Sequence, residues 1–187
     1  MAAEAPEANR GWGAPEFTLS DTSGQLRSLA ELKGARGTVI AFICNHCPYV
    51  KAVLPRLIQD ASELESLGVK VIGINSNDAS AYPEDSFERM AELAPRLSFP
   101  YLYDESQAVA RRYGAVCTPD FFGFDADLKL QYRGRLDASR KDTAPEGTAR
   151  ELFDAMRLIA LEGRGPAVQH TCIGCSIKWR DDAREPV

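Results

Sequence analysis

The sequence predicts a single-domain α/β protein whose central mixed β-sheet is flanked by helices. Two apolar strand patterns, at 38–43 and 69–75, lie on either side of a long amphipathic helix pattern, an order typical of a right-handed βαβ unit with parallel strands. Further along the chain, strand patterns at 121–124 and 129–133 are joined by a turn-forming segment at 125–128, which indicates an antiparallel hairpin. Parallel and antiparallel pairs together make the sheet mixed.

The size and charge of the chain limit the classes of function. Its 187 residues match the ~100–200 residues of one domain. The 27 acidic residues outnumber the 22 basic ones, which argues against a general nucleic-acid binder, since phosphate binding needs clustered positive charge. No apolar run approaches the ~20 residues that cross a bilayer, and the first residues lack the basic and apolar regions of a signal peptide. We therefore expect a cytoplasmic protein with no nucleic-acid and no membrane partner.

The first part of the chain leads into the sheet. Residues 1–13 are mostly small or polar and contain two glycines, so we expect a mobile leader there. An alternating strand at 16–20 ends in a turn, and a short segment at 26–32 follows. The β-branched run at 38–43 suits a strand that is buried on both faces.

The strongest helix pattern follows this strand. Apolar residues recur at three- and four-residue spacing from Val50 to Leu67, and Gly68 ends the segment. Pro55 lies inside the pattern, where the loss of an N–H group predicts a kink. The next strand, at 69–75, completes the βαβ unit.

The rest of the domain alternates helices with the hairpin. We expect a helix at 83–95, bounded by prolines, and another at 104–113, with its first residue, an aspartate, as the cap. An amphipathic helix at 147–161 closes a domain that spans 14–162. A Gly-Arg-Gly-Pro segment then begins a tail at 163–187.

The cysteines are the residues that point to a chemistry. There are five, and four of them form two C-x-x-C pairs, Cys44/Cys47 and Cys172/Cys175; the fifth is Cys117. An odd count in a reducing compartment does not indicate a static disulfide framework. Metal binding or redox chemistry is the better interpretation of such pairs.

The first pair lies where a buried strand ends and the long helix begins. Pro48 suits the first helical position, which puts Cys47 at the cap and Cys44 about one turn upstream. The N–H groups and the dipole of a helix N-terminus stabilise a thiolate, and we expect His46 to lower the pKa of Cys47 further. The alternative is that both cysteines are small core residues.

Several motifs occur in a characteristic order. They are A-P-E-F-T-L at 14–19, the Cys-Pro step that opens the long helix, and Thr118-Pro119 followed by F-F-G-F-D. Together they resemble the thioredoxin fold, and within it the peroxiredoxin-like, or redoxin, branch (the alkyl hydroperoxide reductase/thiol-specific antioxidant family). The segment F-I-C-N-H-C-P-Y-V-K-A at 42–52 and the tail motif G-C-S-I-K-W resemble a bacterial subgroup of that branch.

The resemblance implies that Thr118-Pro119 is a cis peptide beside the active cysteines, with the Thr118 backbone aimed at an extended substrate segment. A trans proline that starts a strand is the alternative. The resemblance leaves two candidates for the attacking cysteine. Alignment of the C-x-x-C pair with thioredoxins selects Cys44, whereas alignment of the Cys-Pro step with redoxins selects Cys47. We favour Cys47 as nucleophile and Cys44 as its partner, because of the helix dipole.

The redoxin register also exposes a departure from the family. The resemblance implies a threonine, which helps to position the peroxide, at the place that Cys44 occupies. We therefore expect poor reduction of peroxides in comparison with disulfides. The same change supplies a second thiol close to Cys47.

The remaining three cysteines leave alternatives open. Cys117 directly precedes the cis dipeptide and is either a third redox thiol or a small core residue. Cys172 and Cys175 follow a flexible segment, so we expect a second dithiol that exchanges with the first pair. Alternatively, the tail packs permanently over the fold, with Ile177 and Trp179 as anchors.

The sequence thus predicts a thiol–disulfide oxidoreductase without a cofactor. Its partners would be a protein or small-molecule disulfide and a reductant that the sequence does not identify. A peroxiredoxin-like antioxidant enzyme is one alternative. A zinc-binding or non-catalytic interaction domain is another, in which the two cysteine pairs supply four thiolates and His170 lies nearby. The oligomeric state does not follow from the sequence.

Overall fold

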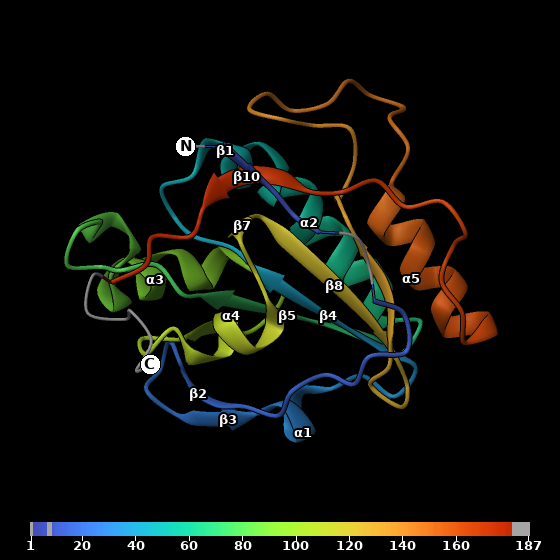
Figure 1. The fold of residues 1–187 in the computed structure, drawn as a ribbon, viewed down its shortest axis with the longest axis horizontal. Coiled ribbons are helices and arrows are strands. Elements are labelled where there is room, and N and C mark those ends of the chain that lie inside the picture. The colour runs from blue at the N-terminus through green and yellow to red at the C-terminus, as the bar shows by residue number, and fades with distance from the viewer. Residues whose placement is uncertain (1, 7–8, 181–187) are drawn as a thin grey trace.

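The computed structural model describes residues 2–6 and 9–180. Its main sheet has the strand order β3-β2-β6-β5-β4-β8-β9 (Figure 1). These strands are β2 (Thr18–Asp21), β3 (Leu26–Ser28), β4 (Gly37–Phe42), β5 (Val69–Asn75), β6 (Tyr101–Tyr103), β8 (Asp120–Asp125) and β9 (Leu130–Gly134). The central strands β4, β5 and β6 are parallel, whereas β8 pairs antiparallel with β4. The predicted mixed sheet is therefore confirmed.

Helices cover both faces of this sheet. They are α1 (Leu29–Leu32), α2 (Pro48–Glu65), α3 (Phe87–Leu93), α4 (Ala108–Tyr113) and α5 (Glu151–Glu162), with short 3-10 turns η1 (Pro83–Asp85) and η2 (Ala94–Arg96). Alternate residues of β4 enter two cores: Val39 and Ala41 pack with α2 and α5, while Ile40 and Phe42 pack with α1 and α4. In the described ranges, the helices are all too short or too polar to cross a membrane.

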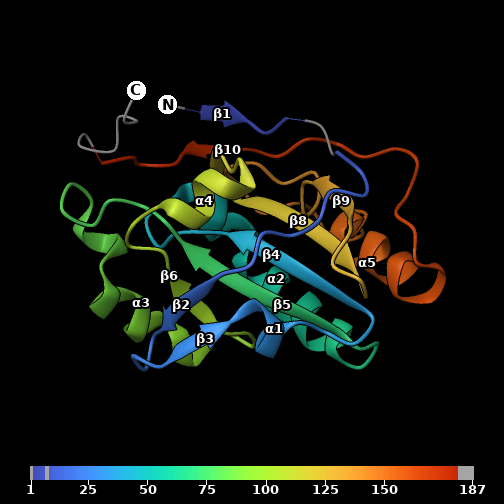
Figure 2. The ribbon, with the colours of Figure 1, turned by 60° about the horizontal axis from the view of Figure 1, so that its bottom comes forward.

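A second, three-stranded sheet joins the two ends of the described chain. It has the antiparallel order β1-β10-β7, with β1 at Ala2–Glu4, β10 at Ile173–Ser176 and β7 at Cys117–Thr118. In Figures 1 and 2, β1 and β10 run side by side at the far side of the molecule from β2 and β3.

This small sheet differs from the expectation of a mobile leader at 1–13 and a freely swinging tail. The N–H of Ala5 donates to the carbonyl oxygen of Cys172 at 3.0 Å, and the side chains of Ala5 and Ile177 are both 3% exposed. β10 is held on the domain by its pairing with β7, β1 by its pairing with β10, and both by the burial of these apolar groups. Of the two predicted anchors, Ile177 is buried, whereas Trp179 is 37% exposed under the guanidinium of Arg111.

The long helix α2 continues through Pro55. A proline in a helix interior costs about 3 kcal/mol relative to alanine. On either side of it, Val53 and Leu57 are 5% and 0% exposed, and full burial of each such side chain contributes about 1.5–3 kcal/mol. Apolar packing on the sheet therefore outweighs the local cost.

Other helices are shorter than their patterns predict, for local reasons. The segment 83–95 is interrupted at Ser86, whose hydroxyl accepts the N–H of Arg89 and starts α3. The helix expected from residue 104 starts only at Ala108, although the Asp104 carboxylate does accept N–H groups of its first turn, those of Val109 and Ala110. The helix expected at 147–161 starts at Glu151, after Gly147 with its φ of 82°.

The approach of β10 to β7 depends on Gly174. A Cβ atom at this position would lie 2.1 Å from the carbonyl oxygen of Thr118. We therefore expect Gly174→Ala to displace β10 and lower the free energy of unfolding by about 1–3 kcal/mol, the usual cost of overpacking. Hydrogen exchange at the Cys175 amide should accelerate, and denaturant unfolding gives the energy.

The matched control is Gly13→Ala, whose Cβ would meet its nearest atom, Nζ of Lys129, at an ordinary 3.5 Å. It should leave both measurements unchanged. Equal behaviour of the two variants would contradict the close packing of β10 against Thr118.

Candidate active site

The structure places Cys47 at the N-cap of α2, in the loop that leaves β4. Pro48 occupies the first helical position, where its missing N–H costs no hydrogen bond. The carbonyl oxygen of Cys47 accepts the first intrahelical bond, from the N–H of Lys51 at 3.0 Å. The local sequence therefore aims the Cys47 sulfur at the positive end of the helix, as expected.

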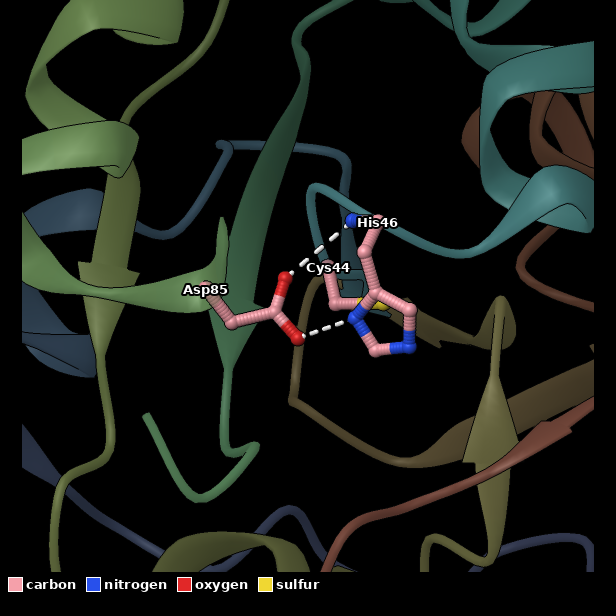
Figure 3. A group of neighbouring side chains, drawn as sticks. All are labelled: Cys44, His46 and Asp85. Carbon is pink, nitrogen blue, oxygen red and sulfur yellow. Dashed lines mark hydrogen bonds and ion pairs between the residues drawn. The ribbon is translucent and has the colours of Figure 1, made fainter. Parts of the chain in front are cut away.

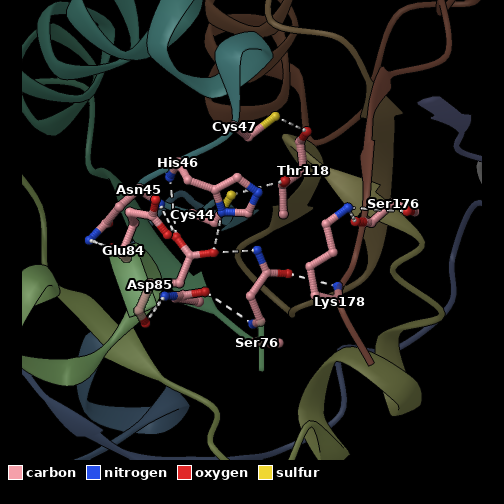
Figure 4. A network of polar contacts seen from close by, with 12 residues as sticks. Cys44, Asn45, His46, Cys47, Ser76, Glu84, Asp85, Thr118, Ser176 and Lys178 are labelled. Carbon is pink, nitrogen blue, oxygen red and sulfur yellow. Dashed lines mark hydrogen bonds and ion pairs between the residues drawn. The ribbon is translucent and has the colours of Figure 1, made fainter. Parts of the chain in front are cut away.

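Two other thiols adjoin the Cys47 sulfur. Cys44 lies one loop turn upstream, and Cys175 comes from β10; hydrogen bonding with the Cys44 side chain, and then with that of Cys175, lowers the pKa of Cys47. In its thiol form, Cys47 instead donates to the carbonyl oxygen of Thr118, 3.2 Å from its sulfur. The Thr118 hydroxyl lies 3.3 Å from the sulfur of Cys44 (Figure 4). The Thr118-Pro119 peptide is cis, as the resemblance implies.

Hydrogen bonding separates the acidities of these three thiols. The Cys44 thiol makes the largest contribution that lowers the pKa of Cys47, and with Cys175 and the Val50 N–H it brings this pKa to about 4 despite burial. The pKa of Cys44 is raised because this thiol donates to Cys47 and is buried near the Asp85 charge. Burial, followed by the neighbouring Cys47 thiolate, raises the pKa of Cys175 to about 11. The site therefore holds one thiolate between two thiols.

Asp85, from η1, holds the loop that carries the cysteines. Its Oδ1 accepts the backbone N–H groups of Asn45 and His46 at 2.7 and 3.2 Å. Its Oδ2 contacts Nδ1 of His46 at 2.5 Å and accepts from Nδ2 of Asn77 at 2.7 Å (Figures 3 and 4). The His46 ring also stacks on Tyr82, with 5.1 Å between ring centroids.

His46 was expected to tune Cys47 directly. In the structure its ring nitrogen Nδ1 contacts Asp85, and the contributions to the Cys47 pKa come from Cys44, Cys175 and backbone N–H groups. His46 is thus a loop-positioning residue in this geometry. Its ring is turned toward Asp85 in Figure 3.

The ligand atoms of Cys44, His46 and Asp85 lie within 4.8 Å of one another, which makes them the one potential metal-binding group among the described residues. The donor set does not suit a cation, however. Both Asp85 oxygens already accept N–H groups, and Cys44 favours the thiol, whereas metal ligation needs a thiolate.

The four-thiolate zinc set predicted as an alternative does not assemble either. The Cys172 thiol donates to the carbonyl oxygen of Gly134 at 2.8 Å, and this cysteine is 1% exposed. His170 contacts Glu151 at 2.8 Å through its Nδ1. The tail pair is therefore split, with only Cys175 beside Cys47.

Cys117 lies in β7, next to Thr118, and is fully buried. Its sulfur is 3.6 Å from the carbonyl oxygen of Pro119, and burial strongly raises its pKa. Asp120, two residues after the cis bond's threonine, forms a buried ion pair with Arg133 at 2.9 Å. Cys117 and the ion pair of Asp120 thus lie directly before and after the Thr118-Pro119 peptide, and all three residues are buried.

The sequence reasoning missed Asp85 and Asn77. Asn75 ends a buried parallel strand and Ser76 and Asn77 directly follow it, and such polar residues at strand ends collect at one edge of the sheet. That signal points to Asn77. For Asp85, in a short turn, we find no comparable signal.

A groove of about 790 Å³ opens beside Cys44, between α2 and the α3 region. Val50, Leu54, Ile58 and Leu93 form part of its apolar lining, and Arg89 lies at its polar side. Cys44 is therefore the site thiol that lines an open groove, while β10 covers Cys47 from the other side.

The acidity of Cys47 can be tested on the reduced protein. Ultraviolet thiolate absorbance should report one group with a pKa of about 4. Cys47→Ser should abolish this transition. Cys44→Ala removes the largest hydrogen-bond contribution and should move it toward the ordinary value of 9.0. Cys172→Ala is the matched control and should leave the transition in place; an unshifted transition in Cys44→Ala would contradict the assignment.

The same shift has a defined effect on stability. Because the pKa of Cys47 is lowered on folding, the folded state binds fewer protons than the unfolded state between pH 4 and 9. The free energy of unfolding of the reduced protein, measured relative to Cys47→Ala, should therefore rise with pH across that window. The stability that the Cys47 thiolate contributes should disappear as the pH falls through 4.

The role of Asp85 gives a separate test. Asp85→Ala leaves the N–H groups of Asn45 and His46 without their acceptor, and an unsatisfied buried donor costs about 1–3 kcal/mol. Hydrogen exchange at these two amides should accelerate, and denaturant unfolding should show the loss. Asp85→Asn keeps one oxygen and should be milder; equal effects of both variants would mean that the carboxylate oxygens do not hold the loop.

Comparisons with known proteins find relatives of this chain. Residues 11–133 match the model of the AhpC/TSA family. Over 117 residues the chain is 28% identical to putative peroxiredoxin Q of Oryza sativa subsp. indica, covering 63% of this chain and 50% of that protein, so it spans about half the length of this relative. It is 26% identical to the thiol-disulfide oxidoreductase ResA of Geobacillus thermodenitrificans, covering 63% of this chain and 64% of ResA.

Two solved structures match nearly the whole chain. An uncharacterized conserved protein from Geobacillus kaustophilus has 45% identity and a TM-score of 0.91, covering 98% of both chains. A hypothetical protein from Sinorhizobium meliloti has 39% identity and a TM-score of 0.89, covering 95% of this chain and 98% of that one. The family model matches residues 11–133, which is more than half of this chain, and the chain therefore belongs to the AhpC/TSA family.

Proposed function

We propose that this protein is a thiol–disulfide oxidoreductase in which Cys47 is the nucleophile and Cys44 the resolving thiol. The observation that carries the proposal is the placement of Cys47 at the N-cap of α2, with its sulfur 3.2 Å from the carbonyl oxygen of Thr118 and the Cys44 sulfur 3.3 Å from the hydroxyl of the same residue. A thiolate is the species that attacks disulfides, and an adjacent thiol completes the exchange. The family relatives include a protein named as a thiol-disulfide oxidoreductase.

The reaction proceeds in two exchanges. The Cys47 thiolate attacks one sulfur of a substrate disulfide, and the other substrate sulfur leaves as a thiolate that takes up a proton. Cys44 then loses its proton and attacks the Cys47 sulfur, which forms the Cys44–Cys47 disulfide and releases the second substrate thiol. The two cysteines lose two electrons and the substrate gains them; of the two protons that the substrate takes up, one equals the proton lost by Cys44 and the other comes from the solvent, because Cys47 starts as a thiolate.

An external thiol reductant of unidentified source restores the dithiol. The sulfur with the lower thiol pKa leaves faster in such exchanges, and in the reduced site that is Cys47. The reductant therefore attacks Cys44, the sulfur that lines the groove between α2 and the α3 region. Protein or small-molecule disulfides remain equal candidates for the substrate, and the cytoplasmic location stays a prediction.

A second candidate is peroxide reduction, because several relatives are named as peroxiredoxins and a thiolate is also the nucleophile in that reaction. The position expected to hold the peroxide-directing threonine is Cys44, which donates its hydrogen bond to Cys47. The site thus offers a resolving thiol where the resemblance implies a hydroxyl. Disulfide exchange is the better match to this arrangement.

The cysteine roles predict distinct variant phenotypes. With insulin as the disulfide substrate and dithiothreitol as the reductant, Cys47→Ser should reduce turnover to the uncatalysed rate. The double variant Cys44→Ser/Cys175→Ser, which removes both thiols beside Cys47, should stall as a mixed disulfide on Cys47, visible by mass spectrometry under non-reducing conditions. Cys117→Ser changes a buried thiol whose sulfur contacts the carbonyl oxygen of Pro119, and it serves as the control.

The same preparations, assayed with hydrogen peroxide, separate the two candidate reactions. We expect peroxide consumption to be slower than disulfide reduction. Faster peroxide turnover that depends on Cys47 would reverse the assignment, and insulin turnover that survives in Cys47→Ser would remove it.

A further inference from the structure

The strand β10 occupies the edge of the loop that carries the cis peptide. Cys175 pairs with Thr118, and Ser176 pairs with Cys117. Thr118 is also the residue whose carbonyl oxygen lies 3.2 Å from the Cys47 sulfur. An extended segment that reaches Cys47 along this edge must therefore take the place of β10.

β10 is closely packed against this edge on one side and paired with β1 on the other. Gly174 has no side chain at the point where a Cβ would lie 2.1 Å from the Thr118 carbonyl oxygen. On the outer side, β1 pairs with Gly174 and Cys175. The backbone of β10 thus sits as close to the cis-proline loop as a paired strand can.

The segment after β10 is anchored to the same network that holds the active-site loop. The N–H of Lys178 donates to Oδ1 of Asn77 at 2.9 Å, and Asn77 donates to Asp85 (Figure 4). The carbonyl oxygen of Lys178 accepts the N–H of Asp78 at 2.9 Å and Nε2 of Gln107 at 2.8 Å. This anchoring fixes the register of β10, in which Cys175 lies opposite Thr118, the residue whose carbonyl oxygen contacts the Cys47 sulfur.

We propose that Cys175 is an internal resolving cysteine, which forms a disulfide with Cys47 while β10 stands in the place of an extended substrate. This inference rests on the proposed role of Cys47 as the attacking thiolate. Cys172 is excluded from the step, because it is buried and donates to the carbonyl oxygen of Gly134. The tail pair is therefore not a dithiol of its own, contrary to the sequence-based expectation.

The exchange needs no additional oxidant once the Cys44–Cys47 disulfide exists. Cys175 loses its proton and attacks the Cys47 sulfur; the Cys47–Cys175 bond forms as the Cys44–Cys47 bond breaks. The electron pair of the broken bond stays on Cys44, which takes up a proton. One disulfide and one thiol are present before and after, so no net oxidation occurs.

The Cys47 sulfur can therefore form either of two disulfides, one with Cys44 and one with Cys175. With Cys47 joined to Cys44, β10 is free to leave the edge and admit a substrate segment. With Cys47 joined to Cys175, the strand is covalently held and the edge is closed, while Cys44 carries a free thiol at its groove.

Peptide mapping provides a direct test. Trypsin should release Cys47 in the peptide 37–51 and Cys175 in the peptide 165–178. The double variant Cys44→Ser/Cys172→Ser leaves a single cysteine in each peptide. After reduction, and oxidation with a slight excess of diamide, we expect these two peptides to be disulfide-linked in most of the protein.

The control is Cys44→Ser/Cys175→Ser, which keeps Cys172 and should show no link between the two peptides. Absence of the link in the first variant, or an equal link in the second, would overturn the inference. The intact wild-type chain, oxidised and fragmented in the same way, should show Cys47 joined to Cys44 in one fraction and to Cys175 in another. A wild-type chain that shows only the Cys44–Cys47 bond would also overturn it.

The outcome is distinguishable from failure of the proposed function. The diamide link reports contact between Cys47 and Cys175 whether or not insulin is reduced. Loss of insulin turnover in Cys47→Ser tests the proposed function without reference to Cys175.

Discussion

The hydrogen bonds that converge on the Cys47 sulfur are the interaction on which the site depends. A thiolate with 0% of its residue surface exposed is costly to form unless donors replace the lost water. Here the donors come from the cysteine loop, from α2 and from β10. All three elements lower the pKa of Cys47, the Cys44 side chain most, so the acidity of this thiol depends on how they are assembled around it.

Asp85 extends this dependence beyond the thiols. Its Oδ1 accepts the two backbone N–H groups after Cys44, and its Oδ2 accepts from Asn77, which in turn accepts the backbone N–H of Lys178. The loop that presents the cysteines and the segment that covers them therefore share one buried polar network. Such networks act as units, since a group that loses its partner inside the protein is left unsatisfied.

Local patterns predicted the elements whose structure depends on near neighbours. The strand at 69–75 and the cap at Cys47 follow from apolar runs and from Pro48, so the sequence was sufficient for them. Packing of the tail over the fold was one of two alternatives, but its pairing with β7 was not predicted, because strand pairing between residues so far apart leaves no local pattern. The spacing of Cys172 and Cys175 was misleading for a related reason: three residues apart on an extended strand, two side chains point to opposite faces.

The small sheet also joins segments from the two ends of the described chain into one cooperative unit. β10 lies between β1 and the two-residue strand β7, and these pairings are antiparallel. Removal of β1 leaves β10 with a single short partner, and removal of β10 leaves β1 without any partner in this sheet. Partial opening that begins at residues 2–5 would therefore spread to Cys175 while the seven-stranded core stays folded, so that a protease or a binding protein acting at one end of the chain would change what covers Cys47.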